Sequence, residues 1–142
     1  MVTYLKIIDA LKAFALAHPQ INTFYSGKTW NFESTENLYP AMIVFPSTTT
    51  IVKGETDINL NIIIVDIMNK DVTNKDDIYS DTLQTMQDVF SLLNNTDEDY
   101  FISDSGFSCD PLEEVFDDIL CGWISNTTIK FPFQANYCLI PS

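Results

Sequence analysis

Hydrophobic residues recur with helical spacing at the start of the chain. Over residues 3–17 they come at intervals of three and four positions, and Lys6, Asp9 and Lys12 fall outside the stripe that they form. Pro19 disfavours helical geometry in the residue before it, so the helix is expected to end at His18. The stripe of this first predicted helix consists of Tyr4, Ile7, Ile8, Leu11, Phe14 and Ala15.

A second amphipathic helix is predicted to end at about residue 93. The polar connection MNKDVTNKDDIYS precedes it, and Asn74, Asp76 or Asp77 is placed to cap its first turn. Asn94 and Asn95 follow its last apolar position. The apolar stripe of this helix consists of Ile78, Leu83, Met86, Val89, Phe90 and Leu93.

Alternating and continuous apolar runs predict the strands. Residues 41–45 form a short apolar run typical of a buried strand, and a threonine-rich connection at 48–50 follows it. Residues 55–68 then alternate, so this strand is expected to begin half solvated and to end buried on both faces. Its Asn59 and Asn61 are expected at a sheet edge or an oligomer contact. Further strands are predicted at 100–102, 107–115 and 122–133.

The order of these elements predicts an α+β fold. Helix, strands, helix, strands, with connections that suit antiparallel pairing, favour a mostly antiparallel mixed sheet with the two amphipathic helices packed on one face. Residues 1–142 have the length of a single domain. Residues 134–142 are an apolar C-terminal tail that is expected to dock on the domain or on a neighbouring subunit.

The charge of the chain limits its partners. It has 20 acidic residues against 7 lysines and no arginine, for a formal net charge of −13. A chain of this kind is poorly suited to neutralising nucleic-acid phosphates or to binding an anionic membrane. Its acidity favours solubility, or a surface past which a polyanion slides without sticking. An acidic binding module, a DNA mimic or an inhibitor of a basic partner, is the alternative that the same charge supports.

The stretch FDDILCGW, residues 116–123, is the richest in candidate chemistry. Adjacent residues of an extended chain point to opposite faces, so Asp117 and Asp118 are poorly placed to share a proton or a metal. A carboxylate-dependent hydrolase is the enzymatic hypothesis, but His18 is the only histidine and no phosphate-cradling loop occurs. We therefore predict no enzyme, no cofactor and no metal site. The two aspartates are interpreted as tying a turn, with Gly122 permitting the bend and Trp123 anchoring the last strand in the core.

The three cysteines are spaced too widely for a zinc knuckle or a redox pair. They are an odd number, and apart from two short glycosylation patterns, at residues 94–96 and 126–128, nothing in the chain suggests secretion. Free thiols in a reduced compartment are the expected state of Cys109, Cys121 and Cys138.

Four stretches, in this order along the chain, resemble bacteriophage tail-terminator proteins. They are the first amphipathic helix; LYPAMIVF at residues 38–45; the long strand over residues 57–66; and the acidic turn, glycine and tryptophan of residues 116–123. The chain is similar to ring proteins of the lambda U type, which also occur as head-to-tail connectors. It resembles still more closely the small virion proteins of crAss-like phages of gut Bacteroidetes, whose short tails favour a ring between portal and tail.

The resemblance implies a structural, non-enzymatic virion protein of a tailed bacteriophage. Its implied place is a homo-oligomeric ring of roughly six- or twelve-fold symmetry in the neck or tail, assembled in the host bacterial cytoplasm and bound to portal, connector and tail ring proteins. Double-stranded DNA passes through the lumen of such a ring without sequence-specific binding, and no membrane is involved. From the exposure pattern, the interface is predicted at the connections 47–54 and 69–76 and in the tail. The residues are Thr48, Thr49, Thr50, Lys53, Asn69, Lys70, Asn74, Tyr137, Leu139 and Ile140.

Overall fold

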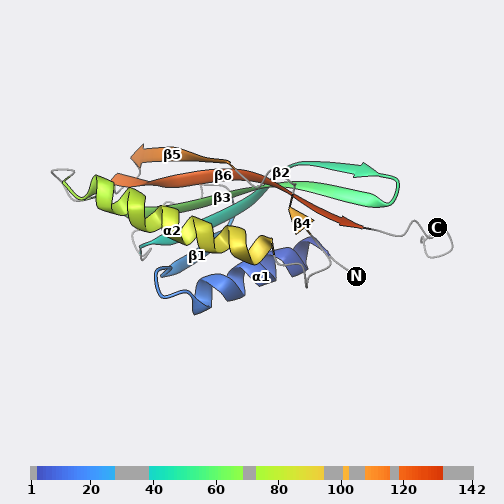
Figure 1. The fold of residues 1–142 in the computed structure, drawn as a ribbon, viewed down its shortest axis with the longest axis horizontal. Helices are drawn as coiled ribbons and strands as arrows, with labels where there is room; N and C mark the ends of the chain where they lie inside the picture. Colours follow the sequence, from blue (N-terminus) through green and yellow to red (C-terminus); the bar gives the residue numbers. More distant parts are fainter. Residues whose placement is uncertain are drawn as a thin grey trace.

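The protein has an α+β fold, as the sequence predicts. The computed structural model describes residues 3–27, 39–68, 73–94, 101–102, 108–115 and 119–132. Figure 1 shows a long sheet with both helices on the same side of it. The elements in chain order are α1 (Tyr4–Ala17), β1 (Thr23–Ser26), β2 (Ala41–Val52), β3 (Glu55–Ile67), α2 (Lys75–Leu93), β4 (Phe101–Ile102), β5 (Ser108–Val115) and β6 (Ile119–Pro132).

In the described residues the sheet has six strands and is mixed. Its order is β1-β2-β3-β6-β4, and β5 also pairs with β6. Among the described strands, only β1 and β2 run parallel, and the other pairs are antiparallel. The longest pairing joins β3 to β6, from Glu55 opposite Pro132 to Ile67 opposite Leu120. These two strands therefore form the centre of the sheet.

The two helices begin and end close to the predicted positions. The Thr3 hydroxyl accepts a hydrogen bond of 3.2 Å from the Lys6 amide at the start of α1, and His18 ends that helix. Asn74 is the N-cap of α2 and makes no side-chain capping bond. The acidic residues in the first turn of α2, Asp76 and Asp77, interact favourably with the positive end of the helix dipole.

The main core lies between the helices and the inner face of the sheet. Residues of α1, α2, β2, β3 and β6 meet there and exclude water. Burial of this apolar surface is the principal stabilising contribution to such a fold. The residues of this core are Ile7, Ile8, Leu11, Ala15, Ile21, Met42, Val44, Ile58, Leu60, Ile62, Ile64, Met86, Val89, Leu93, Ile129 and Phe131.

Strand β3 is buried in the way that its alternating sequence predicts. Up to Asn61 it buries only every second residue, and from Ile62 to Val65 it is buried on both faces. The prediction that Asn59 and Asn61 lie at an edge is wrong, because β3 is a central strand. Their side-chain oxygens accept hydrogen bonds across the sheet, from Thr128 at 2.6 Å and from Asn126 at 2.9 Å. Asparagine and threonine side chains paired in this way form a cross-strand ladder.

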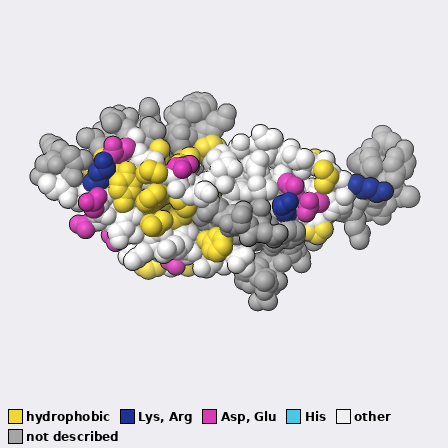
Figure 2. All heavy atoms as spheres, turned by 45° about the horizontal axis from the view of Figure 1, so that its top comes forward, with side chains coloured by type: hydrophobic (Ala, Val, Ile, Leu, Met, Phe, Trp, Pro, Cys, Tyr) yellow, Lys and Arg dark blue, Asp and Glu magenta, His cyan; other side chains and the backbone are white. Residues whose placement is uncertain are grey.

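The face of the sheet turned away from the helices is divided into two regions. Hydrophobic side chains gather toward the end opposite the β2–β3 turn, and an uncharged band separates them from that turn (Figure 2). The asparagine and threonine ladder lies on this face, because Asn59 and Asn61 alternate along β3 with residues of the main core. The buried residues of the apolar region are Ala41, Ile43, Ile63, Val65 and Leu120.

Strand β2 is much longer than the apolar run that predicted it. The threonine-rich segment 48–50 was predicted as a connection, but it belongs to this strand and pairs with β3 up to Val52 opposite Glu55. The register shifts between Pro46 and Thr49, which indicates a β-bulge. Threonine is β-branched and suits a strand, so a polar run of this type does not require a loop. Gly54, at a φ of 84°, then turns the chain into β3.

Candidate functional site

Gly122 lies where two strands approach each other closely. It is opposite Val65 in the β3–β6 register. A Cβ added at Gly122 would lie 1.9 Å from the carbonyl oxygen of Ile64, far inside van der Waals contact. Close approach of the two backbones therefore requires the glycine, whereas the sequence was interpreted as placing a bend there. The turn residues of the same motif, Asp117 and Asp118, lie outside the described residues.

Trp123 connects β6 to the start of α2. Its indole Nε1 donates a hydrogen bond of 2.9 Å to the backbone carbonyl of Tyr79. The two aromatic rings meet edge to face, with centroids 5.4 Å apart and planes at 64°. Trp123 is half-buried and packs against the main core. Its contacts hold the helix onto the sheet.

The predicted interface residues lie at opposite ends of the described structure. Thr48, Thr49, Thr50 and Lys53 are exposed on the β2–β3 hairpin. Asn74 lies at the start of α2, at the other end of the long axis (Figure 1). The structure therefore does not bring the two groups together in one copy. The remaining predicted interface residues, Asn69, Lys70, Tyr137, Leu139 and Ile140, lie outside the described residues.

The end of the β2–β3 hairpin is an exposed projection of the sheet. All residues from Pro46 to Gly54 are exposed, and among the described strands β1 pairs with β2 only at Ala41–Val44. Two large hydrophobic residues at the hairpin end face solvent, Ile51 with 68% and Val52 with 47% of their surface exposed. The interface segment 47–54 predicted from the sequence contains both residues, although the residues named individually there were the threonines and Lys53. Their signal was an apolar pair directly before the Lys53-Gly54 turn.

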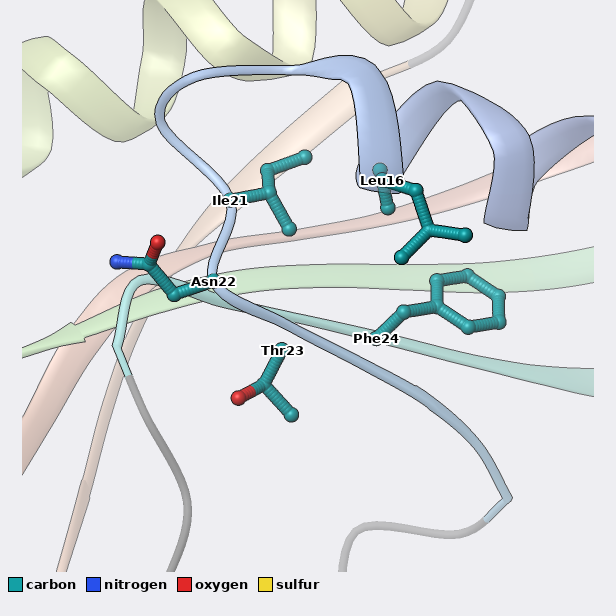
Figure 3. A pocket seen from close by; sticks show the side chains of 6 residues that line it. Leu16, Ile21, Asn22, Thr23 and Phe24 are labelled. Carbon is teal, nitrogen blue, oxygen red and sulfur yellow. The ribbon is translucent and has the colours of Figure 1, made fainter.

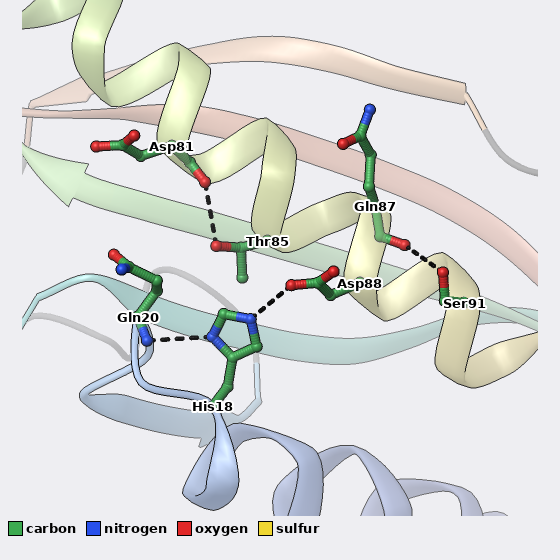
Figure 4. A network of polar contacts seen from close by, with 7 residues as sticks. All are labelled: His18, Gln20, Asp81, Thr85, Gln87, Asp88 and Ser91. Carbon is green, nitrogen blue, oxygen red and sulfur yellow. Dashed lines mark hydrogen bonds and ion pairs between the residues drawn. The ribbon is translucent and has the colours of Figure 1, made fainter.

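His18 belongs to a polar network that joins the two helices (Figure 4). Its Nδ1 accepts a hydrogen bond of 3.1 Å from the Gln20 amide, so the proton of the neutral ring lies on Nε2. That nitrogen is 2.7 Å from Oδ2 of Asp88 on α2 and donates to it. The ring also packs against Phe14, with centroids 5.1 Å apart. The sequence placed His18 at the end of the first helix, but its carboxylate partner is 70 positions away and left no local signal.

Asp66, near the end of β3, lies in an environment that disfavours its charge. Partial burial raises the pKa of this carboxyl, and the negative charge of Asp81 on α2 raises it further. The hydrogen bond from the Ile67 amide to Asp66 Oδ1, at 2.8 Å, partly offsets these two effects. The ionised carboxylate therefore carries a desolvation penalty in the folded protein.

We expect Asp66→Asn to raise the thermal stability of the protein at neutral pH. Because the pKa is higher in the folded state than in the unfolded state, the folded state binds the proton more tightly. The stability of the parent chain should accordingly fall as the pH rises above about 3.9, the ordinary pKa of aspartate, and through the raised value. The amide carries no charge, so the gain in melting temperature should shrink as the pH is lowered. Asp9→Asn, on the exposed side of α1, is the control.

Melting curves recorded from acidic to neutral pH test this expectation. A lower melting temperature for Asp66→Asn at neutral pH would contradict it. That result would mean that the hydrogen bond to Ile67 needs the full carboxylate charge.

The cysteines that the structure describes are free thiols. Cys121 is buried and Cys109 is half-buried, and burial raises the pKa of both thiols. Both therefore stay protonated at neutral pH. Cys138 lies outside the described residues. Within the described part of the chain, no group of three His, Cys, Asp or Glu side chains is placed to hold a metal ion.

Comparison of the chain with models of protein families and with curated proteins finds no match. The resemblance to tail-terminator proteins therefore depends on the four stretches described above. None of the helices in the described residues has the length and apolar character needed to cross a membrane.

Proposed function

We propose that the protein is a structural subunit of a tailed-bacteriophage virion. In this proposal it forms a closed homo-oligomeric ring of roughly six- or twelve-fold symmetry, in the neck or tail, that connects the portal to the tail. The observation that carries the proposal is the β2–β3 hairpin, whose end extends past the helices with Ile51 and Val52 exposed (Figure 1). That the particle is a tailed bacteriophage is inferred from the four sequence stretches, which resemble tail-terminator proteins and occur in the same order.

A projecting hairpin with an apolar end suits a subunit contact. Thr48, Thr49 and Thr50 are exposed along the outer strand of the hairpin, and its end presents large apolar side chains to water. Exposed apolar groups and unpaired strand edges promote association with other chains. In a ring, such a projection reaches the neighbouring copy and is covered there.

The charge of the chain suits a passage for DNA. A net charge of −13 and the absence of arginine leave few cations for phosphates. Two of the lysines are paired with carboxylates, Lys75 with Glu113 and Lys130 with Asp57, the latter at 3.7 Å. Double-stranded DNA should move through an acidic lumen without being held, and no sequence-specific contact is expected.

Purified virions provide the test of this proposal. We expect mass spectrometry of particles to find the protein at a fixed ratio to the portal protein. Cryo-electron microscopy should place its density in a ring coaxial with the portal. Particles that lack the protein would overturn the proposal. Capture of a basic non-virion partner in a complex that dissociates in salt would support the acidic binding module instead.

A further inference from the structure

A pocket at the junction of α1 and β1 exposes apolar side chains. It has a volume of about 210 Å³. Figure 3 shows Leu16 and Phe24 side by side, with Thr23 at the start of β1 and Asn22 directly before it. Leu16 has 77% of its surface exposed, so its own chain leaves it largely uncovered. The residues that line the pocket are Ala15, Leu16, Ile21, Asn22, Thr23 and Phe24.

The pocket is of a size that accepts one apolar group. A cavity of ~150 Å³ lined by Leu, Ile and Phe binds benzene, so a pocket of this volume has room for a branched aliphatic side chain. The polar side chain of Asn22 is already bound, because its Nδ2 donates a hydrogen bond of 2.7 Å to the Tyr39 carbonyl. An apolar occupant would therefore leave that amide satisfied.

The hairpin end has the matching chemistry. Ile51 and Val52 are exposed there, and the segment 46–54 carries Lys53 and no acidic residue. The chain as a whole has a net charge of −13. The hairpin end is thus a locally cationic, apolar part of an acidic protein. A second copy of the same chain attracts this end through its overall net charge, and the residues that line its pocket are uncharged.

The hairpin end cannot reach the pocket of its own chain. Thr23 beside the pocket pairs with Ala41 at the start of β2, and Val52 is at the other end of the same strand. Eleven residues of extended chain span about 35 Å at ~3.3 Å per residue. Contact between the hairpin end and the pocket must therefore join two different molecules.

We propose that the hairpin end of one copy packs against the α1–β1 pocket of the next copy and inserts the side chain of Val52 there. The adjacent Ile51 points to the opposite face of the strand. The inference rests on the ring function proposed above and names the contact between its subunits. Because the two surfaces differ and lie far apart, the contact is heterologous and passes from copy to copy. A rotation that returns to the first copy closes a ring.

Cysteine cross-linking between two single variants tests the contact. Val52→Cys is mixed with Leu16→Cys at the highest soluble concentration and oxidised. The control mixture combines Val52→Cys with Leu5→Cys. Leu5 is 64% exposed on the same helix, about 16 Å from Leu16 along its axis. The parent chain, with its native cysteines, gives the background. A disulfide needs Cα atoms within ~7 Å, so the reaction reports a direct approach.

We expect at least tenfold more cross-linked dimer in the Leu16→Cys mixture than in the Leu5→Cys mixture. Both substituted side chains are exposed, and unchanged melting temperatures would show that the variants fold. Equal yields in the two mixtures, or yields no greater than background, would overturn the pocket contact. Particles that nevertheless contain the ring would then leave the proposed function standing.

A chain that carries both Val52→Cys and Leu16→Cys distinguishes the two proposals further. A closed ring should give a ladder of cross-linked species that ends at one size on a denaturing gel. An open-ended ladder would support the contact and contradict the closed ring.

Discussion

Replacing Gly122 with alanine should destabilise the protein by about 3 kcal/mol or more, at the upper end of what overpacking costs. The added Cβ would lie 1.9 Å from the Ile64 carbonyl oxygen and 2.9 Å from the Val65 Cα. Both atoms belong to the backbone of β3, so no side chain can rotate away. Strands β3 and β6 at the centre of the sheet would have to move apart. Because both strands contribute residues to the main core, this movement would also disturb the core packing. Urea unfolding followed by circular dichroism measures the loss.

Gly54→Ala is the matched control for this substitution. Gly54 has a φ of 84°, but no atom lies within 4 Å of the position of an added Cβ. Alanine there should cost only about 1–2 kcal/mol, from the left-handed backbone conformation. If Gly122→Ala costs no more than Gly54→Ala, the strands have room to adjust and the close approach does not restrict residue 122 to glycine.

Replacing Trp123 with alanine is expected to cost about 3 kcal/mol, the low end for removal of a large aromatic side chain. The low end applies because Trp123 is half-buried. Its loss would remove the edge-to-face contact with the Tyr79 ring and the hydrogen bond to the Tyr79 carbonyl. The start of α2 should separate from the sheet before the rest of the helix. Hydrogen exchange of the amides in α2 would detect this local opening.

Trp123→Phe separates the contribution of the aromatic contact from that of the hydrogen bond. Phenylalanine keeps an aromatic ring against Tyr79 but removes the Nε1 donor, so we expect a loss of about 1 kcal/mol. The Tyr79 carbonyl lies inside α2, where a backbone N–H of the next helical turn also donates to it. A loss below about 1 kcal/mol for Trp123→Ala would mean that other contacts hold α2 on the sheet.

Local periodicity was enough to predict the helices and the central strand. Helix α1 and its end at His18 follow from three- and four-residue spacing and from Pro19. The change in β3 from one buried face to two follows from its alternation. The same reasoning ended β2 too early, because the hydrophobic signal stops where the strand leaves the core. A strand that projects into solvent keeps its backbone pairing without apolar residues, and threonine tolerates that setting.

Residue types identified parts of the candidate site, but not what those parts contact. Gly122 and Trp123 stood out by composition alone. Their partners, the Ile64 carbonyl and Tyr79, come from β3 and α2 and depend on strand register and helix placement. Ile51 and Val52 lay within the segment 47–54 that was predicted as a connection, and not at the end of a strand. The tertiary structure shows that the helices end before the hairpin does. Ile51 and Val52 are therefore not covered by any described part of the chain.

Covalent geometry explains why the single elements could be predicted from the sequence and the contacts between them could not. Side-chain direction repeats every 3.6 residues in a helix and every two in a strand, so the faces of single elements can be read along the chain. Strand order, the pairing of His18 with Asp88 and the separation of the hairpin end from the α1–β1 pocket join residues distant in sequence. Those features were decided by how the elements pack together, because each depends on burial and hydrogen bonding between elements and not within one.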